Sequence, residues 1–240
     1  MADDPKSLRV LAVDAGGSRV KVLLSTGGER RRFASGPNLT AADMVERVLE
    51  LTKDWDYDAI SVGVPAPVMG GKVAHDPVNL GEGWAGFDFE AAFGKPTQVV
   101  NDAAMQALGS YEGGRMLFLG LGTGLGSAMV VDGVLEPMEL GHLPYRKETY
   151  EDFVGARGLK RLGKKRWRKQ VAEVVAEFTA SLEPDYVVLG GGNAKLLHEL
   201  PPNARLGDNR NAFVGGFRLW ESPGQARAGH VPGTENTPST

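Results

Sequence analysis

Residues 8–24, LRVLAVDAGGSRVKVLL, and residues 116–131, MLFLGLGTGLGSAMVV, follow the same pattern. In each stretch an apolar run leads into a glycine-rich turn, and a second apolar run begins at once. Short apolar runs bounded by glycine are typical of β-strands joined by tight turns. Each stretch therefore predicts an antiparallel strand pair, and their repetition predicts two lobes that begin alike.

The rest of the chain adds strands and helices to each lobe. Apolar residues from Met44 to Thr52 keep a 3.6-residue period and predict a helix that opens at Thr40. A second helix is predicted where Trp167 to Leu182 form one continuous apolar face. The other expected elements are strands at 30–34, 60–64, 97–100 and 186–189, and helices from Asp102 to about Tyr111, at about 149–162, from Asn193 and at about 209–220. The glycine-rich, irregular residues 69–87 favour a binding loop.

The boundary between the lobes is predicted at Glu112-Gly-Gly-Arg115, because a new strand–turn–strand pattern begins just after it. We therefore expect an N-terminal lobe at 1–113 and a C-terminal lobe at 114–222. Residues 223–240 are rich in Pro, Gly, Ser and Thr and nearly free of apolar residues, which predicts a disordered tail.

Composition excludes several classes of protein. The chain has 240 residues, of which 42 % are hydrophobic, so it can bury a core. A net charge of −3 argues against a general nucleic-acid binder. The absence of cysteine excludes disulfides, thiolate zinc ligands and a cysteine nucleophile. No apolar run approaches the roughly 18 residues of a membrane span, and no signal peptide is evident, so we expect a cytoplasmic protein without a membrane partner.

Three glycine-rich turns each follow an expected buried strand: Asp14-Ala-Gly-Gly-Ser18, Gly120 to Gly126, and Gly190-Gly-Gly-Asn193. Glycine lets backbone N–H groups approach an anion closely and permits a positive φ. One such turn alone is more often a tight hairpin or a helix cap, but three together favour phosphate binding. Neither common nucleotide motif fits, because the second turn runs into a strand and no GxxxxGK[ST] occurs.

Polar residues next to these elements are candidates for chemistry. Asn101 and Asp102 lie between a strand and a helix, where they could cap the helix or present a carboxylate base to a substrate hydroxyl. Glu139 and His142 lie in a loop, and such a pair is usually structural; as two ligands without cysteine they would make only a weak metal site. Glu151 begins a helix, where it could simply favour the helix dipole.

The order of these motifs over residues 8–220 resembles one family. The chain is similar to ROK-type sugar kinases of the actin-like ATPase superfamily, and among them to the bacterial polyphosphate glucokinase branch. The matching segments are Asp14-x-Gly16-Gly17-Ser18-x-x-Lys21, Pro65-Ala66-Pro67-Val68, Asn79-Leu80 with Trp84, Asn101-Asp102-Ala103, Leu121 to Ser127, Glu139-Leu140-Gly141-His142, Glu151, and Gly190 to Gly192.

The resemblance implies a two-lobed α/β fold of the actin-like (ribonuclease H-like) type, with a mixed sheet in each lobe and a central cleft. It implies a glucokinase-type enzyme of glycolysis that moves a phosphoryl group from ATP or inorganic polyphosphate to a hexose, with the 6-hydroxyl of glucose as acceptor. Asp102 would be the general base. The residues that it implies for the sugar are Asn79, Asn101, Asp102, Glu139, His142 and Glu151. The residues that it implies for phosphate or nucleotide are Asp14, Gly16, Gly17, Ser18, Lys21, Gly122, Thr123, Gly124, Gly190, Gly191 and Gly192.

The resemblance also implies a metal cofactor. Phosphoryl transfer uses a divalent cation, and Mg²⁺ would be held by Asp14 through water. Most ROK kinases carry a cysteine-rich zinc loop after the Gly-His pair, but residues 143–150 contain no cysteine, so we expect no zinc. Two further departures, Ala66 in place of the Gly of many relatives and Ala104 in place of a frequent second Asp, leave the exact sugar and the donor open. A homodimer is also left open.

A basic cluster suggests the donor. Seven of the ten residues from Lys160 to Lys169 are Lys or Arg, although the chain is acidic overall. A solvated helix face is the simpler explanation, but a helix start disfavours positive charge, so the cluster also predicts an anionic partner. Polyphosphate is the partner that the resemblance supplies, with Lys164, Lys165 and Arg168 as the expected contacts.

Other classes of protein fit the sequence less well. A ROK-type repressor would carry a helix-turn-helix ahead of Asp14, and only 13 residues precede it here. An actin-like or chaperone-like ATPase would need the glycine turns but not the Asn-Asp and Glu-x-x-His motifs. A catalytically weak sugar-sensing module would share the whole site and stays the alternative.

Overall fold

The computed structural model describes residues 8–208 and 210–221, so the predicted tail at 223–240 lies outside the described residues. Its core consists of two five-stranded sheets. The first has the order β3 (Arg31–Ala34), β2 (Arg19–Leu24), β1 (Val10–Ala15), β4 (Ala59–Val64) and β7 (Thr97–Asn101). The second has the order β10 (Val134–Met138), β9 (Leu125–Val131), β8 (Arg115–Leu121), β13 (Tyr186–Gly190) and β14 (Ala204–Leu206).

The two sheets repeat one topology. In each, the first three strands form an antiparallel meander, and two later strands add in parallel beside the first strand. The predicted strand pairs around the first two glycine turns are confirmed, with Ala15 opposite Val20 and Leu121 opposite Leu125 at the closed ends. The mixed α/β architecture with one sheet in each half is confirmed as well.

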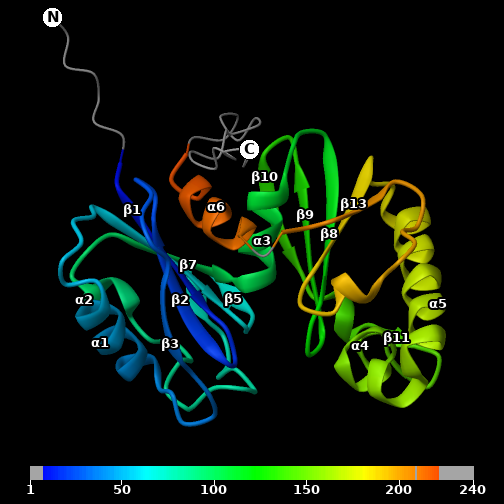
Figure 1. Cartoon of the computed structure of the whole chain (residues 1–240), viewed down its shortest axis with the longest axis horizontal. Helices are drawn as coiled ribbons and strands as arrows, with labels where there is room; N and C mark the ends of the chain where they lie inside the picture. Colours follow the sequence, from blue (N-terminus) through cyan, green and yellow to red (C-terminus); the bar gives the residue numbers. More distant parts are fainter. Residues whose placement is uncertain (1–7, 209, 222–240) are drawn as a thin grey trace, which may run out of the picture.

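Helices separate and cover the sheets (Figure 1). The helices are α1 (Ala41–Leu51), α2 (Phe89–Phe93), α3 (Asp102–Ser110), α4 (Tyr150–Val154), α5 (Ala156–Leu182) and α6 (Asn211–Arg218), with short 3-10 helices η1 (Leu140–His142) and η2 (Ala194–Leu196). Two hairpins complete the fold, β5–β6 (Val68–Met69 and Lys72–Val73) and β11–β12 (Pro144–Tyr145 and Glu148–Thr149). The helices α1 and α2 lie at one end of the molecule and α5 at the other, while α3 and α6 lie between the sheets (Figure 1).

The apolar pattern of α1 and α5 decides which face each helix buries. Thr40 caps α1, since its hydroxyl accepts a hydrogen bond from the Asp43 N–H at 3.1 Å. The helix then buries Met44, Val45 and Val48 in the core of the first sheet. On α5 the predicted apolar face from Trp167 to Phe178 is buried in the core of the second sheet.

The central helices α3 and α6 cross at glycines. A Cβ at Gly109 would lie 1.8 Å from the carbonyl oxygen of Asn211, and a Cβ at Gly215 would lie 1.7 Å from that of Met105. Only glycine permits this approach of the two backbones. The helix α6 therefore packs on α3, β1 and β4 of the first sheet, although it follows the second sheet in the chain. The lobe boundaries given above remain a prediction.

Two helix predictions were wrong in detail. The helix expected at about 149–162 is split at Gly155 into α4 and α5. A Cβ at Gly155 would lie 2.7 Å from the carbonyl oxygen of Thr123 and would push away the second glycine turn. The helix expected from Asn193 is only a 3-10 turn, because the Asn193 amide donates to the Gly122 carbonyl at 3.0 Å instead of capping a helix. Inside α5, Gly163 is non-helical, with φ 72° and ψ 159°, so a new helical run begins at Lys164.

Candidate functional site

Asp102 is placed at the junction of both halves of the fold. It begins α3 directly after β7, and its neighbour Ala103 packs against Gly126 of the second sheet, where an added Cβ would lie 2.6 Å from that of Ala103. Asn101 caps the helix: its side-chain oxygen accepts from the N–H of Ala103 at 2.9 Å, and its amide donates to the Ala66 carbonyl at 3.2 Å. The capping interpretation of Asn101 is thus confirmed, and one N–H of its amide remains for a ligand.

The surroundings of Asp102 tune its acidity. Burial among protein atoms raises the pKa of Asp102 to about 7, and the negative charges of Asp14 and Glu139 add to the rise. The hydrogen bond that its carboxylate accepts from the Ala103 N–H, at 2.8 Å, acts in the opposite direction. Asp102 as a whole residue is half-buried, so solvent still reaches part of it. A carboxylate with this pKa exchanges a proton readily near neutral pH.

Asp14 lies at the end of β1 and is 6 % exposed. Lys21 stands opposite it on β2, and the Lys21 ammonium donates to the Asp14 carboxylate at 2.7 Å. The turn between the two strands is open at its tip, where Ser18 is exposed, and Ser35 fixes its base by donating to the Gly16 carbonyl at 2.6 Å. The first glycine turn therefore presents backbone and a hydroxyl to solvent beside a buried carboxylate.

Asn79 lies against this first turn. A Cβ on Gly17 would lie 3.0 Å from the Cβ of Asn79, so glycine is needed here for close approach. The loop that carries Asn79 is fixed from both sides: the Asp76 carboxylate accepts from the Trp84 N–H at 2.7 Å, and the Trp84 indole donates to the Leu39 carbonyl at 3.0 Å. The irregular segment 69–87 is therefore an ordered loop that packs against the first glycine turn.

Glu139, His142 and Glu151 converge in the second half of the fold. The two ring nitrogens of His142 lie 3.6 Å from a Glu139 carboxylate oxygen and 3.9 Å from one of Glu151. These separations exceed a normal hydrogen bond, and the His142 and Glu139 side chains are 61 % and 47 % exposed. The three side chains therefore face one another while keeping free hydrogen-bonding capacity for a polar ligand.

The second and third glycine turns lie side by side. The N–H of Asn193 donates to the Leu121 carbonyl at 2.9 Å, and Gly191, with φ +81°, passes so close to Leu121 that a Cβ would lie 2.6 Å from its carbonyl. A Cβ on Gly124 would lie 2.2 Å from a carboxylate oxygen of Glu151. The second turn is thus in contact with the cluster of Glu139, His142 and Glu151. Among the predicted phosphate-binding glycines that the structure describes, only Gly191 has a positive φ, and Gly17, Gly124 and Gly190 allow a close approach of neighbouring atoms.

A groove of about 1060 Å³ lies elsewhere, between β3 and α1, and is lined by residues such as Phe33, Pro37 and Arg47. None of the predicted site residues lines it. Acidic and basic side chains both line this groove.

Proteins with a similar sequence or structure are known, although no family model matches the chain. A polyphosphate glucokinase of Mycobacterium tuberculosis is 27 % identical over 225 residues, which covers 84 % of this chain and 83 % of the relative. The crystal structure of an inorganic polyphosphate/ATP-glucomannokinase from Arthrobacter sp. strain KM matches with a TM-score of 0.75 at 24 % identity, covering 88 % of this chain and 97 % of that one. The chain is a homologue of polyphosphate glucokinases and shares the fold of ROK family sugar kinases. A ROK family glucokinase from Streptomyces griseus, solved with glucose and AMPPNP, has a TM-score of 0.67 at 17 % identity over 88 % of this chain and 98 % of that one.

The basic cluster at 160–169 is less uniform than the sequence indicated. Arg161 pairs with Glu148 at 2.6 Å, and Arg168 donates to the Leu196 carbonyl at 2.6 Å. Lys164 and Lys165 are exposed at the start of the helical run after Gly163, and no ion pair is seen for them among the described residues. The open positive charge is therefore concentrated at these two lysines and their exposed neighbours on α5.

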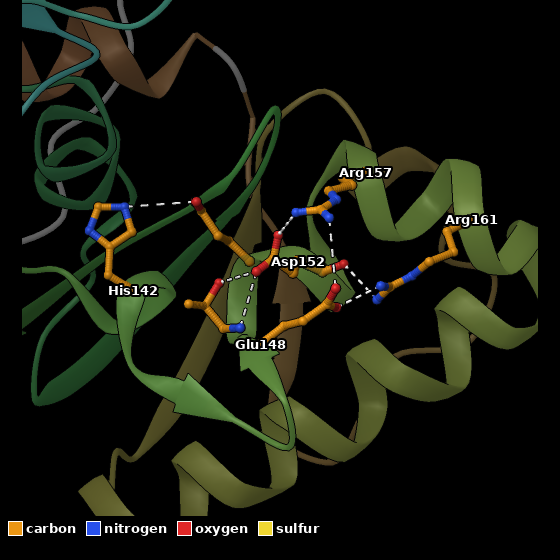
Figure 2. A network of polar contacts seen from close by, with 7 residues as sticks. His142, Glu148, Asp152, Arg157 and Arg161 are labelled. Atoms are coloured by element: carbon orange, nitrogen blue, oxygen red, sulfur yellow. Dashed lines mark hydrogen bonds and ion pairs between the residues drawn. The ribbon is translucent and has the colours of Figure 1, made fainter.

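Sequence reasoning missed an ionic network around α4. Figure 2 shows Arg157 and Arg161 extending from α5 toward Glu148 and Asp152, beside His142. The Arg157 guanidinium donates to the Asp152 carboxylate at 2.7 Å and lies 3.7 Å from that of Glu148. No helical charge pattern in the sequence indicated the network, because Glu148 lies in β12 and Asp152 in α4, and their arginine partners lie on α5.

The structure also bears on membrane association. Over residues 8–208 and 210–221, no helix combines the length and the apolar character that a membrane crossing requires.

Proposed function

We propose that this chain is a glucokinase-type phosphotransferase that moves a phosphoryl group from ATP or inorganic polyphosphate to the 6-hydroxyl of glucose. One observation carries the proposal: Asp102, with its pKa raised to about 7, lies where the charges of Asp14 and Glu139 reach it from the two halves of the fold. The similarity to polyphosphate glucokinases supports glucose as the acceptor. This arrangement would supply a base, Asp102, and converging polar groups at the same site.

In the proposed reaction Asp102 accepts the proton of the glucose 6-hydroxyl. The sugar oxygen then forms a bond to the terminal phosphorus of the donor, and the bond from that phosphorus to the bridging oxygen breaks. The products are glucose 6-phosphate and either ADP or a polyphosphate shortened by one phosphate, while the proton stays on Asp102 until it passes to solvent. Because a base works best when its pKa lies near the working pH, the raised pKa of Asp102 fits this role.

We propose that the cluster of Glu139, His142 and Glu151 holds the other sugar hydroxyls. Carboxylates accept hydrogen bonds and imidazole both donates and accepts, so together they match a ring of hydroxyl groups. Asn79 and the remaining amide N–H of Asn101 would complete the set from the first half of the fold. The first and second glycine turns and Gly190 to Gly192 would bind donor phosphates through backbone N–H groups.

The residues present fit a Mg²⁺ ion. Burial raises the pKa of Asp102 most and the negative charge of nearby Asp14 adds to the rise, while Lys21 forms an ion pair with Asp14. The described residues include no group of three or more His, Cys, Asp or Glu placed for a metal, but Mg²⁺ needs only one or two carboxylates together with phosphate and water. We propose that Asp14 holds it through water. When bound, Mg²⁺ would neutralise charge on the donor phosphates.

The proposal is tested with a coupled assay for glucose 6-phosphate, run with ATP and with polyphosphate and, for comparison, with mannose and N-acetyl sugars. Glucose-dependent product with either donor is expected. Calorimetric binding of glucose without turnover would favour the sugar-sensing module instead, and failure to bind any sugar would refute the site. Sedimentation of the same preparation tests whether the protein forms a homodimer, and fractionation of the native host tests a cytoplasmic location.

We further propose that polyphosphate contacts Lys164 and Lys165. The exposed lysines stand where the helical run restarts, which disfavours positive charge unless an anion is near. The double variant Lys164→Glu/Lys165→Glu should raise KM for polyphosphate far more than KM for ATP, and the wild-type affinity for polyphosphate should fall steeply with salt. Arg30→Glu/Lys53→Glu, which makes the same change of charge on exposed residues of the first half, is the control. Equal effects of both double variants, or no turnover with polyphosphate at low salt, would refute this role.

A further inference from the structure

Helix α4 is too short to hold its own shape. It comprises five residues, Tyr150–Val154, and carries Glu151 in its first turn. Isolated helices of this length are unstable in water, because nucleation fixes several residues for very few hydrogen bonds. The direction in which the Glu151 carboxylate points therefore depends on contacts that α4 makes with the rest of the chain.

The two ends of α4 are held by different contacts. At its start the Asp152 carboxylate accepts from both the N–H of Thr149, at 3.1 Å, and the hydroxyl of Thr149, at 2.8 Å. At its end the indole N–H of the buried Trp167 donates to the Val154 carbonyl at 2.8 Å. The first pair of contacts bridges Glu151 within its own segment, and the second ties only the end of α4 to α5, so neither holds both sides of Glu151 against α5.

Arg161 contacts both sides of Glu151. From α5 its guanidinium donates to the Glu148 carboxylate at 2.6 Å and to the main-chain carbonyl of Asp152 at 3.1 Å. One acceptor lies three residues before Glu151 and the other one residue after it. The guanidinium also lies over the Phe153 ring, 4.8 Å from its centroid, so its own position is restricted. The planar guanidinium presents several N–H donors in a fixed fork that suits two separated acceptors, whereas an ammonium group is a compact charge without that fixed geometry.

We propose that Arg161 is a positioning residue for the sugar site: it holds the Glu148 side chain before Glu151 and the Asp152 backbone carbonyl after it, and thereby keeps the Glu151 carboxylate between Gly124 and His142. This inference rests on the proposed function. It also separates Arg161 from the lysines that follow it on α5, because Arg161 would act on the sugar and the lysines on the donor.

The experiment compares wild type with Arg161→Met, Arg161→Lys and Lys160→Met. In Arg161→Met an apolar side chain still covers Phe153, but the hydrogen bonds to Glu148 and to the Asp152 carbonyl are lost. In Arg161→Lys a positive charge remains that can reach one of these two acceptors. Lys160 is the matched control, because it is an exposed neighbour on the same helix without an ion pair among the described residues. Circular dichroism and thermal unfolding establish that each variant is folded.

We expect Arg161→Met to raise KM for glucose about threefold to tenfold, within the range that coupled neighbouring residues show. The calorimetric Kd for glucose should rise equally, while KM for the donor stays unchanged. Arg161→Lys should lie between wild type and Arg161→Met, and Lys160→Met should match wild type. A residue that served stability alone would lower the unfolding temperature and leave the glucose KM unchanged.

A double-mutant cycle with Glu151→Gln decides whether Arg161 acts through Glu151. If it does, Arg161→Met should have little further effect on glucose affinity once Glu151 has lost its charge. Full additivity of the two substitutions, or an unchanged glucose Kd in Arg161→Met, would overturn the inference. If Glu151→Gln itself leaves glucose binding unchanged, the proposed sugar site fails instead, so the two failures are distinguishable.

Discussion

Substitution of Asp102 by Asn should make the protein more stable and nearly inactive. The reason lies in the raised pKa of Asp102, about 7 in the folded protein against an ordinary value of 3.8. Between these two values the folded state holds a proton that the unfolded state has released, so the stability of the wild-type protein falls as the pH rises through this range. Above about pH 7 both states carry the carboxylate, and the loss is complete.

The size of the effect follows from the same two values. At about 1.4 kcal/mol per pKa unit, the difference between 3.8 and about 7 corresponds to about 4 kcal/mol of stability lost by the wild type at alkaline pH. The amide introduced by Asp102→Asn has almost the same shape as the carboxylate and no charge, so the variant escapes this loss. Between pH 5 and pH 8 the gap in unfolding free energy between variant and wild type should widen by about 2 to 3 kcal/mol.

The assay is urea unfolding of both proteins from pH 5 to pH 8, without sugar, donor or divalent cation, alongside turnover measurements. Turnover of Asp102→Asn should fall by about 10² to 10⁴, as expected for removal of a general base, and the wild-type kcat/KM should rise through an apparent pKa near 7. A stability gap that stays constant with pH would refute the assigned environment of Asp102. Turnover close to wild type would refute its role as the base.

The remaining predictions concern the sugar, zinc and the central helices. Three single variants should each weaken glucose binding by about 1.5 to 3 kcal/mol while leaving nucleotide binding intact, as calorimetry would show: Glu139→Gln, His142→Ala and Glu151→Gln. Elemental analysis should find no stoichiometric zinc, and one equivalent of bound zinc would contradict the expectation drawn from the cysteine-free loop. Gly215→Ala should lower the unfolding free energy by about 1 to 3 kcal/mol, because its Cβ would lie 1.7 Å from a carbonyl oxygen of α3. Gly192→Ala, whose Cβ would meet no atom within 4 Å, is the stability control and should leave that free energy nearly unchanged.

Much of the fold could be predicted because its signals are local. The strand pairs around the first two glycine turns, the Thr40 cap and the apolar face of α5 are all fixed by residues close in sequence. The short strand β14 and the third strand of the second meander, β10, were missed. Both lie at sheet edges, where a strand needs few apolar residues and leaves little pattern in the sequence.

The candidate site divides in the same way. The motifs containing Asp102, Glu139 and Glu151 could be picked out by their residue types, and the resemblance supplied their roles. The distances that join them could not be predicted, because each lies after a different strand or helix. One error has the same cause: the helix from Asn193 was predicted from its sequence neighbours, but the Asn193 amide donates to the Gly122 carbonyl, which is distant in the chain.

The return of α6 to the first sheet has a consequence for how the protein is made. A nascent chain leaves the ribosome from its N-terminus, so β1 is among the first segments to emerge, while α6 is the last helix that the structure describes. Gly216 of α6 packs so close to β1 that a Cβ would lie 2.8 Å from that of Ala12. Until α6 has been synthesised, this face of the first sheet lacks the helix that covers β1, whereas all five strands of the second sheet have already been synthesised. The half of the molecule that is translated first is therefore the half that is completed last, and a chain that stops short of α6 leaves an apolar sheet face open to aggregation.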